Sequence, residues 1–278
     1  MIWIVTDTGQ EHKTDRENGL VVLDCPILVN GEHPEEKLDA ASFYALLDEE
    51  GISVTTSQVS PAEYMDVFEE LTKNPEDEVV CITIGSRLSG TCNSARLASQ
   101  GNERIHLVDS NTVCLPETML VDEAIRLRKE GKSAAEIAAI LDEEKKNIRI
   151  LAYIPVLKYL KKGGRISPAK AAIGDLAGIK PIITIEDGEV AVAAKCRGMK
   201  KAMRTLMDQA KAYDIDLSRP VSFGYTGIDD ATAKAMIEEF EKSMGQKAEH
   251  TPVPLTFLIG VHVGPEGAGF GFFTKDLK

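Results

Sequence analysis

The spacing of hydrophobic and polar residues changes character along the chain. Residues 2–6, 79–84 and 105–108 are short apolar runs, rich in β-branched residues, and each leads into a polar loop. Such runs are typical of buried strands. Between and after them the apolar spacing becomes helical, as in 117–129. Strands that alternate with helices predict parallel β-α-β units, so we expect an open parallel sheet in residues 1–150.

Two helix starts in this part of the chain carry capping signals. Ser60 precedes Pro61 and is followed three residues later by Glu63. Ser133 is followed by Glu136 at the same spacing. A serine and a glutamate three residues apart can satisfy each other's backbone N–H groups at a helix start, and proline fits the first helical position. The sequence therefore predicts that helices begin after these serines.

The pattern in residues 151–278 differs. Two strand-like runs, 182–185 and 190–194, flank the dipeptide 187–188, which reads Asp-Gly. This dipeptide favours a two-residue β-hairpin. Upstream, Ser167-Pro168 has the signature of a helix start.

A second antiparallel pair is predicted near the C-terminus. Residues 257–263 and 270–273 are apolar runs that flank a glycine-rich turn, which places His262 at the end of a strand. Helices and hairpins together predict an α+β domain. The fold class is therefore α/β with two domains, residues 1–150 with a parallel open sheet and 151–278 with an α+β arrangement.

Charge divides the chain in the same way. Lys plus Arg is 32 and Asp plus Glu is 44, a net charge of −12, which argues against nucleic acid and against anionic membranes as partners. Residues 1–150 contain 14 basic and 29 acidic residues, so 14 − 29 gives −15, whereas 151–278 contain 18 and 15, which gives +3. Residues 158–204 contain eleven Lys or Arg and four Asp or Glu, which gives +7. This basic stretch is either a solvated face or a surface for phosphate or an acidic partner.

The cysteines and the apolar runs indicate a compartment. The five cysteines form no C-x-x-C pair, and an odd count fits no closed set of disulfides, so we expect buried thiols in a reducing cytoplasm. No apolar run approaches the ~18 residues of a membrane-spanning helix. We therefore expect no integral membrane segment. The cysteines are Cys25, Cys81, Cys92, Cys114 and Cys196.

Several common enzymatic motifs are absent from the sequence. It has no phosphate-binding loop, no dinucleotide fingerprint, no H-E-x-x-H and no G-x-S-x-G. The five histidines are scattered without the spacing of metal ligands. We expect neither a cofactor nor a metal ion.

Hydroxyl-rich loops are the remaining candidates for chemistry. Thr56 and Ser57 precede a capped helix, and Ser89, Gly90 and Thr91 lie between a strand and a helix. In open α/β sheets ligands bind beyond the carboxyl ends of the strands, and free N–H groups at a helix start favour an anion. Glycine allows close approach of a ligand to the backbone. The alternative is that these residues are only caps and turns. His262 is likewise either a site residue or a structural histidine.

Taken together, the segments resemble the DegV family of fatty acid-binding proteins. The resemblance implies a two-domain α/β protein that holds one long-chain fatty acid between or within its domains. It also implies that the protein performs no chemistry itself, has no catalytic residue and presents the acid to a separate fatty acid kinase, which phosphorylates its carboxyl group for phospholipid synthesis. The matching segments are IVTDT (4–8), TTSQVSPAEY (55–64), ITIGSRLSGT (82–91), LVDS (107–110), LKYLKKGGRIS (157–167), IKPIITIEDGEV (179–190) and IGVHVGP (259–265).

The resemblance also assigns individual residues. Those that match the carboxylate-binding groups of the family are Thr56, Ser57, Ser89, Gly90, Thr91 and His262. Arg165 and Arg197 look like residues that face the kinase or a phosphate. The competing interpretation is an enzyme that acts on a small phosphorylated or carboxylated substrate, with Ser89 or Ser57 as nucleophile and His262 as base. A DNA-binding regulator is a third interpretation, and the net charge makes it the weakest.

Overall fold

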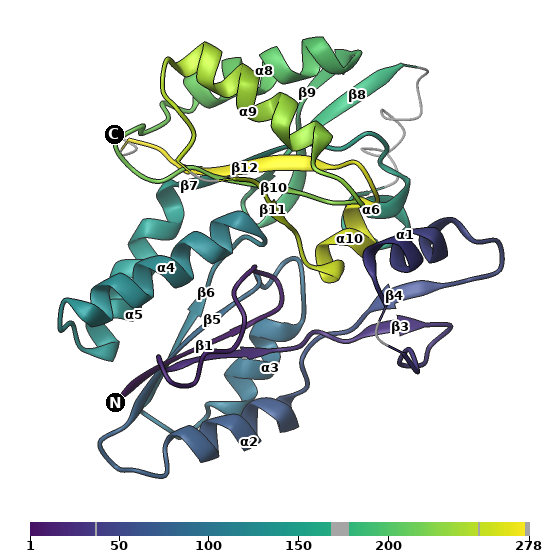
Figure 1. Ribbon diagram of the computed structural model, residues 1–278. Helices are drawn as coiled ribbons and strands as arrows, with labels where there is room; N and C mark the ends of the chain where they lie inside the picture. Colours follow the sequence, from purple (N-terminus) through teal and green to yellow (C-terminus); the bar gives the residue numbers. More distant parts are fainter. Residues whose placement is uncertain (37, 168–177, 250, 276–278) are drawn as a thin grey trace. The chain divides into compact units, whose positions relative to one another are not determined.

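The chain forms two compact units, and we describe each by itself. The computed structural model describes residues 1–36, 38–167, 178–249 and 251–275. Unit 1 comprises Met1–Pro26 and Ser57–Lys146, and unit 2 comprises Ile27–Thr56 and Asn147–Lys278 (Figure 1). Residues 27–56 thus belong with the C-terminal part, whereas the sequence-based division at residue 150 assigns them to the first domain. The helix start predicted at Ser167-Pro168 lies outside the described residues.

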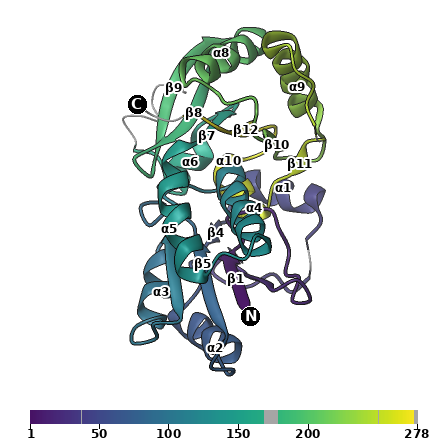
Figure 2. The ribbon, with the colours of Figure 1, turned by 90° about the vertical axis from the view of Figure 1, so that its left-hand side faces the viewer.

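Unit 1 is built on a parallel sheet with the strand order β2-β1-β5-β6. Helices α2 and α3 lie on one face of it and α4 and α5 on the other (Figures 1 and 2). This confirms the predicted parallel open sheet, and it puts the loops after β1 and β5 at the same edge. The strands are β1 (Ile2–Asp7), β2 (Leu20–Leu23), β5 (Glu78–Thr83) and β6 (Ile105–Asp109), and the helices are α2 (Pro61–Leu71), α3 (Thr91–Ala98), α4 (Leu115–Lys129) and α5 (Ala134–Glu144). The 3-10 helix η1 (Lys145–Asn147) follows α5 and leads into unit 2.

Both predicted capping boxes are present in unit 1. The Ser60 side chain accepts a hydrogen bond from the backbone N–H of Glu63, and the Glu63 carboxylate accepts one from the backbone N–H of Ser60. Ser133 and Glu136 make the same reciprocal pair at the start of α5. A cap of this kind contributes about 1 kcal/mol, so the helix starts are fixed locally by the sequence.

Unit 2 is built on a mixed sheet with the strand order β11-β10-β12-β7-β8-β9. All neighbours are antiparallel except β10 and β11. The hairpin between β8 and β9 turns at Asp187 and Gly188, whose φ angles are 50° and 75°, which confirms the predicted two-residue turn. The strands are β7 (Ile148–Tyr153), β8 (Ile179–Glu186), β9 (Glu189–Arg197), β10 (Ser222–Tyr225), β11 (Val253–Pro254) and β12 (Ala268–Phe273).

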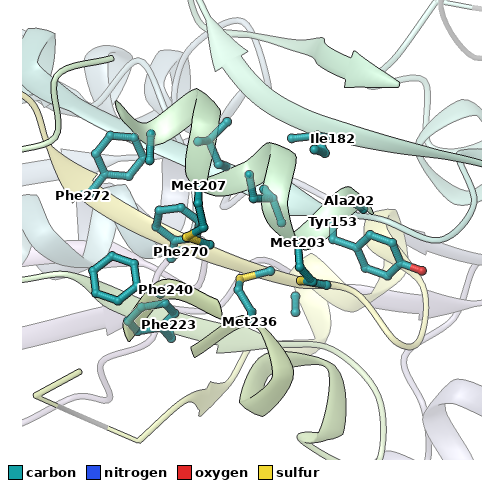
Figure 3. Close-up of a cluster of buried hydrophobic side chains, with 14 of the residues drawn as sticks. Tyr153, Ile182, Ala202, Met203, Met207, Phe223, Met236, Phe240, Phe270 and Phe272 are labelled. Atoms are coloured by element: carbon teal, nitrogen blue, oxygen red, sulfur yellow. The ribbon is translucent and has the colours of Figure 1, made fainter. Parts of the chain in front are cut away.

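The main core of unit 2 lies between this sheet and two helices, α8 (Met199–Ala212) and α9 (Ala231–Met244). Figure 3 shows Phe270 on β12 and Phe223 on β10 beside Met207 from α8 and Met236 from α9. All four side chains are buried. This core holds the sheet without help from residues 27–56.

Residues 27–56 form a second, smaller core within unit 2. β3 (Ile27–Val29) pairs antiparallel with β4 (Val54–Thr56), and α1 (Ala40–Asp48) runs between them in sequence. On α1, Phe43 stacks on Phe257 with ring centroids 4.2 Å apart. These aromatic side chains pack with Tyr159 on α6 (Lys158–Lys162) and with Val261. The aromatic packing explains why residues 27–56 belong to unit 2.

The predicted strand at 257–263 is wrong. Phe257–Val263 is a short helix, α10, and β12 pairs with β7 and β10 rather than with this segment. A continuous apolar run has no periodicity that separates a buried strand from a buried helix. Gly260 lets this helix pack closely against α1, because a Cβ there would lie 2.8 Å from the ring of Phe43 and from the hydroxyl of Tyr44. His262 is therefore on a helix, not at the end of a strand.

Candidate functional site

The hydroxyl residues predicted in unit 1 form a cluster at the start of α3. The Oγ of Ser89 and the Oγ1 of Thr91 are 2.9 Å apart, and the backbone N–H of Thr91 donates to the Ser89 Oγ at 3.2 Å. Thr91 is buried and Ser89 is half-buried. One of the two hydroxyls therefore donates to the other. The hydroxyl that accepts this hydrogen bond still has its own proton, which it can donate to a ligand.

Gly90 brings a second predicted segment to this cluster. A Cβ at Gly90 would lie 1.7 Å from the Oε1 of Gln58, whose Nε2 donates to the Oγ of Ser94 at 2.9 Å. The backbone of Ser57, next to Gln58, donates to the carbonyl of Pro26 at 2.8 Å. The segment that carries Ser57 is thus held against the first turn of α3 because residue 90 has no side chain. We call Ser57, Ser89, Gly90 and Thr91 the serine cluster, in which Ser57 is exposed and lies beside the hydrogen-bonded pair of Ser89 and Thr91.

Two carboxyl groups that the sequence analysis did not single out lie in the same unit. Asp7, at the end of β1, and Glu117, on α4, are both 0% exposed. Burial raises the pKa of Asp7 to about 7, although hydrogen bonds from the backbones of Ile84 and Gly9 act in the opposite direction. Burial, and then the charge of Asp7, raise the pKa of Glu117 well above its ordinary value. Burial thus favours the protonated form of Glu117, and Asp7 is poised between its two forms.

The predicted histidine belongs to a cluster in unit 2. The Nε2 of His262 on α10 lies 3.0 Å from the Oγ1 of Thr56 at the end of β4. Gly163, at the end of α6, leaves room for the imidazole, because a Cβ there would be 2.2 Å from its Nδ1. Three segments distant in sequence thus meet at this ring. We call Thr56, Gly163 and His262 the histidine cluster.

The imidazole of His262 is neutral. Burial, and then the positive charge of Arg165, lower the pKa of His262 to about 4. Its Nδ1 is buried and has no hydrogen-bond partner within the described part of the chain. A neutral ring with one nitrogen on Thr56 can offer the other to a polar ligand group, and a buried nitrogen without a partner is unfavourable until it does so.

The two predicted arginines differ in their surroundings. Arg165 is half-buried, donates to the carbonyl of Gly163 and acts electrostatically on His262. Arg197 is exposed at the end of β9, opposite Ile179. The structure therefore brings Arg165 to the histidine cluster and leaves Arg197 on the surface.

Sequence reasoning missed Asp7, Glu117, Gln58 and Gly163. Asp7 ends a strand, which is a common place for a site residue, but a single aspartate there is no signal of burial. In the sequence, the Gly163-Gly164 pair indicates only the end of a helix, although Gly163 leaves room for the ring of His262.

No helix within 1–36, 38–167, 178–249 or 251–275 is long and apolar enough to cross a membrane.

Comparison with known proteins identifies the family. The DegV family, described as uncharacterised proteins, matches residues 1–275. A DegV domain-containing protein of Caldanaerobacter subterraneus is 36% identical over 284 residues, which cover 99% of each chain. The chain belongs to the DegV family.

Solved structures agree in fold. A structure reported for fatty acid binding of a DegV family protein from Thermus thermophilus is 31% identical, covers 99% of both chains and gives a TM-score of 0.85. The Streptococcus pneumoniae Fatty Acid Kinase (Fak) B3 protein, loaded with linoleic acid, gives a TM-score of 0.84 at 18% identity, over 99% of both chains. At that identity the second match shows a shared fold.

Proposed function

We propose that this protein binds one long-chain fatty acid and presents its carboxylate to a separate fatty acid kinase. The observation that carries the proposal is the pair of clusters described above, each of which offers uncharged hydrogen-bond donors in a partly buried setting. The fatty acid-binding relative from Thermus thermophilus, similar over almost the whole chain, supports the same ligand class.

The energetics of a fatty acid fit such clusters. Burial of the acyl chain contributes ~0.8 kcal/mol per CH₂, so a long chain supplies ample affinity. The carboxylate is the unfavourable part, because an unpaired buried anion costs several kcal/mol. Hydroxyl and backbone N–H donors satisfy it without an opposite full charge. A head group held in this way remains transferable, which suits a carrier.

Each cluster is a candidate for the head group. In unit 1 the donors are the side chains of Ser57, Ser89 and Thr91, with Gly90 leaving the backbone accessible. In unit 2 they are Thr56 and the neutral His262. Variants in one cluster and then in the other would decide which of them binds the carboxylate.

The kinase is the second part of the proposal. The basic stretch 158–204 places exposed positive side chains on unit 2, among them Arg197 at the end of β9. Phosphate groups and acidic surfaces are both attracted by such side chains. We assign Arg197 to the kinase surface and Arg165 to the boundary between that surface and the histidine cluster.

The competing enzymatic function is less well supported. His262 would have to act as general base, yet its Nε2 faces Thr56 and its pKa of about 4 makes it a weak proton acceptor. A nucleophilic serine also needs a base within about 3 Å. The Oγ of Ser89 has Thr91 at that distance instead. We therefore favour a carrier that performs no chemistry itself. We also propose that it works in the reducing cytoplasm, where its five buried thiols would remain free.

Mass spectrometry of ligands extracted from the purified full-length protein tests the ligand class. We expect a fatty acid at about one per chain. A phosphorylated or otherwise polar small molecule in its place would favour the enzyme. Transfer is tested by adding a fatty acid kinase and ATP and trapping the acyl phosphate with hydroxylamine. Failure to form the hydroxamate with several such kinases would exclude the partner but not the ligand.

The serine cluster is tested by Ser89→Ala. A hydrogen bond to a charged group contributes about 1.5–3 kcal/mol, so we expect palmitate to bind roughly 10- to 100-fold more weakly by titration calorimetry. Ser99→Ala, at the other end of the same helix, is the matched control and should leave the affinity unchanged. Unchanged affinity in the Ser89 variant would remove this cluster from the head group site.

A further inference from the structure

Asp7 has a place in unit 1 that fatty acid binding by itself does not explain. Its side chain is 0% exposed, and both carboxylate oxygens are used. The backbone N–H of Gly9 donates to Oδ1 at 2.8 Å, and that of Ile84 donates to Oδ2 at 3.0 Å. One buried carboxylate thus ties together the loop that follows β1 and the loop that follows β5.

A short series of backbone contacts leads from Asp7 to Ser89. The backbone N–H of Ile84 donates a hydrogen bond to the carboxylate of Asp7. The carbonyl of the next residue, Gly85, accepts hydrogen bonds from the backbone N–H groups of Leu88 and Ser89 at 2.8 and 3.2 Å. The N–H of Gly85 itself donates to the carbonyl of Thr112 at 2.7 Å. The backbone of Ser89 is therefore hydrogen-bonded to Gly85, the residue that follows Ile84, which Asp7 holds.

A second series of contacts leads from the loop of Asp7 to Thr91. Thr8 follows Asp7 in sequence, and its Oγ1 accepts a hydrogen bond from the backbone N–H of Cys25 at 2.9 Å. The Sγ of Cys25 lies 3.7 Å from the Oγ1 of Thr91. Ser89 and Thr91 are thus both connected to the segment that Asp7 anchors, Ser89 through the loop that follows β5 and Thr91 through Cys25.

We propose that Asp7 is a positioning residue that sets the orientation of the Ser89 and Thr91 hydroxyls toward a ligand carboxylate. The proposal rests on the proposed function of the serine cluster. Asp7 does not touch the ligand in this proposal. It acts by holding Gly9 and Ile84, and its effect therefore depends on whether the ligand has a carboxylate for the hydroxyls to bind.

The chemistry of the two N–H groups explains why the residue is aspartate. Both groups point at the side chain, so it must accept twice. A carboxylate has two acceptor oxygens, whereas the amide of asparagine has one oxygen and an NH₂ that only donates. Asp7→Asn keeps the shape and the burial but leaves one backbone N–H facing another donor. Glu117 is nearby, but neither of these N–H groups donates to it.

The test compares two ligands with the same chain and different head groups. Full-length wild type and Asp7→Asn are titrated with palmitate and with 1-hexadecanol. We expect the variant to bind palmitate at least tenfold more weakly and hexadecanol with an unchanged affinity. In a Ser89→Ala background, Asp7→Asn should produce a smaller further loss for palmitate than it does in wild type, because only the Thr91 hydroxyl remains to be positioned. Equal losses for both ligands, or additive losses in the double variant, would overturn the proposal and make Asp7 merely structural.

Two controls distinguish failure of the role proposed for Asp7 from failure of the function proposed for the serine cluster. Glu117→Gln keeps the size of the side chain and removes its titration, and it should bind palmitate like wild type. If Ser89→Ala alone leaves palmitate binding intact, the proposed function of the serine cluster fails, and the proposal about Asp7 fails with it. If Ser89→Ala weakens binding and Asp7→Asn does not, only the role of Asp7 is wrong.

A measurement on the wild-type protein covers the case in which Asp7→Asn does not fold. Amide hydrogen exchange of Ile84 and Gly9 reports directly on their bonds to Asp7. Because positioning is reciprocal, palmitate should slow exchange at these two amides at least severalfold more than hexadecanol does at equal saturation. Equal protection by the two ligands would overturn the proposal.

Discussion

The serine cluster of unit 1 and the histidine cluster of unit 2 offer the same kind of hydrogen-bond donor in opposite electrostatic settings. The serine cluster lies in a unit whose interior holds Asp7 and Glu117. The histidine cluster lies beside Arg165, and burial, and then the positive charge of Arg165, lower the pKa of His262. An uncharged donor can therefore be prepared in two ways. In unit 1 burial raises the pKa of both nearby acids, and in unit 2 burial keeps the imidazole of His262 from taking a proton.

The two clusters also differ in what fixes their geometry. In unit 1 the orientation is set by hydrogen bonds, from Asp7 to Ile84 and from Gly85 to Ser89. In unit 2 it is set by space, since the ring of His262 occupies the volume that a side chain at Gly163 would need. Removing the hydrogen bonds of Asp7 and adding a side chain at Gly163 should therefore change stability and palmitate affinity in different ways, and both quantities can be measured.

The pH dependence of stability should differ most clearly between the units. The pKa of Asp7 is about 7 in the folded chain and 3.8 ordinarily. The folded state therefore holds the proton more tightly, and this stabilisation is complete below pH 3.8 and is lost as the pH rises to 7. The difference corresponds to at most about 4 kcal/mol. We expect the free energy of unfolding of wild type minus that of Asp7→Asn to fall by a few kcal/mol between pH 4 and 7 in urea titrations.

Other groups that face Asp7 remain in the variant. Tyr64 and Cys25 interact electrostatically with Asp7, but their pKa values are raised above 10 and 9, so neither titrates between pH 4 and 7. The charge of Asp7 also raises the pKa of Glu117, so both proteins are compared in a Glu117→Gln background, which removes that coupled titration. A difference that does not change with pH would contradict the raised pKa of Asp7.

His262 should give the opposite slope. Its pKa is about 4 in the folded chain against 6.5 ordinarily, so the unfolded chain binds the proton more tightly. The corresponding stabilisation, at most about 3 kcal/mol, is present above pH 6.5 and is lost as the pH falls to 4. Compared with His262→Gln, wild type should therefore gain stability from pH 4 to 6.5. A loss over this range would mean that the imidazole is charged in the folded protein.

Gly163→Ala tests whether space alone fixes the histidine cluster. The backbone at Gly163 is helical, with φ −77°, so alanine is conformationally acceptable there and its effect is confined to the clash with His262. We expect the ring to turn away from Thr56 and palmitate to bind roughly tenfold more weakly, which is about 1.4 kcal/mol. Gly164→Asn is the matched control, because that residue has φ 70° and open space around it. Full affinity in Gly163→Ala would show that the histidine cluster does not bind the head group.

The two arginines should separate transfer from binding. Arg197→Ala should leave palmitate affinity unchanged and reduce acyl phosphate formation by the kinase several-fold, because its charge lies on the surface. Arg165→Ala should reduce both, the affinity by about threefold, because its charge also acts on the histidine cluster. The readouts are titration calorimetry and the hydroxamate assay. Identical effects of the two substitutions would contradict the different places that we assign to them.

Gly90→Ala should have the smallest effect of the series. Its Cβ would clash with the Oε1 of Gln58, but that atom is the end of an exposed, flexible side chain that can move away. We expect a loss of palmitate affinity of less than about threefold, reversed in the double variant Gly90→Ala/Gln58→Ala. A loss as large as that of Gly163→Ala would mean that Gln58 itself orients the head group.

Much of the fold could be predicted from local sequence. The capping boxes at Ser60 and Ser133 and the hairpin at Asp187-Gly188 depend on residues within a few positions of one another, and all three are present. The parallel sheet of unit 1 follows from the alternation of strands and helices. These motifs can be predicted from sequence because the hydrogen-bond donors and acceptors that they pair lie within the same short segment.

The parts that could not be predicted depend on distant residues. The segment at 257–263 is a helix that packs through Gly260 against α1, which lies more than two hundred positions earlier in sequence. Thr56 and Ser57 are neighbours in sequence but belong to different units. Asp7 gave no signal, since its burial and its bond to Ile84 follow from the pairing of β1 with β5.

The discontinuity of unit 1 has a consequence for synthesis on the ribosome. Everything that unit 1 contains has been made once Lys146 is added, and the hydrogen bond from Ser57 to Pro26 can close residues 27–56 off as a loop. Closing a loop of that size has a modest entropic cost, so unit 1 can fold while translation continues. The aromatic side chains on α1 must wait for Phe257 and Val261, which emerge almost last. During that interval the apolar side chains of residues 40–48 have no partners from the C-terminal part of unit 2 and are exposed to solvent.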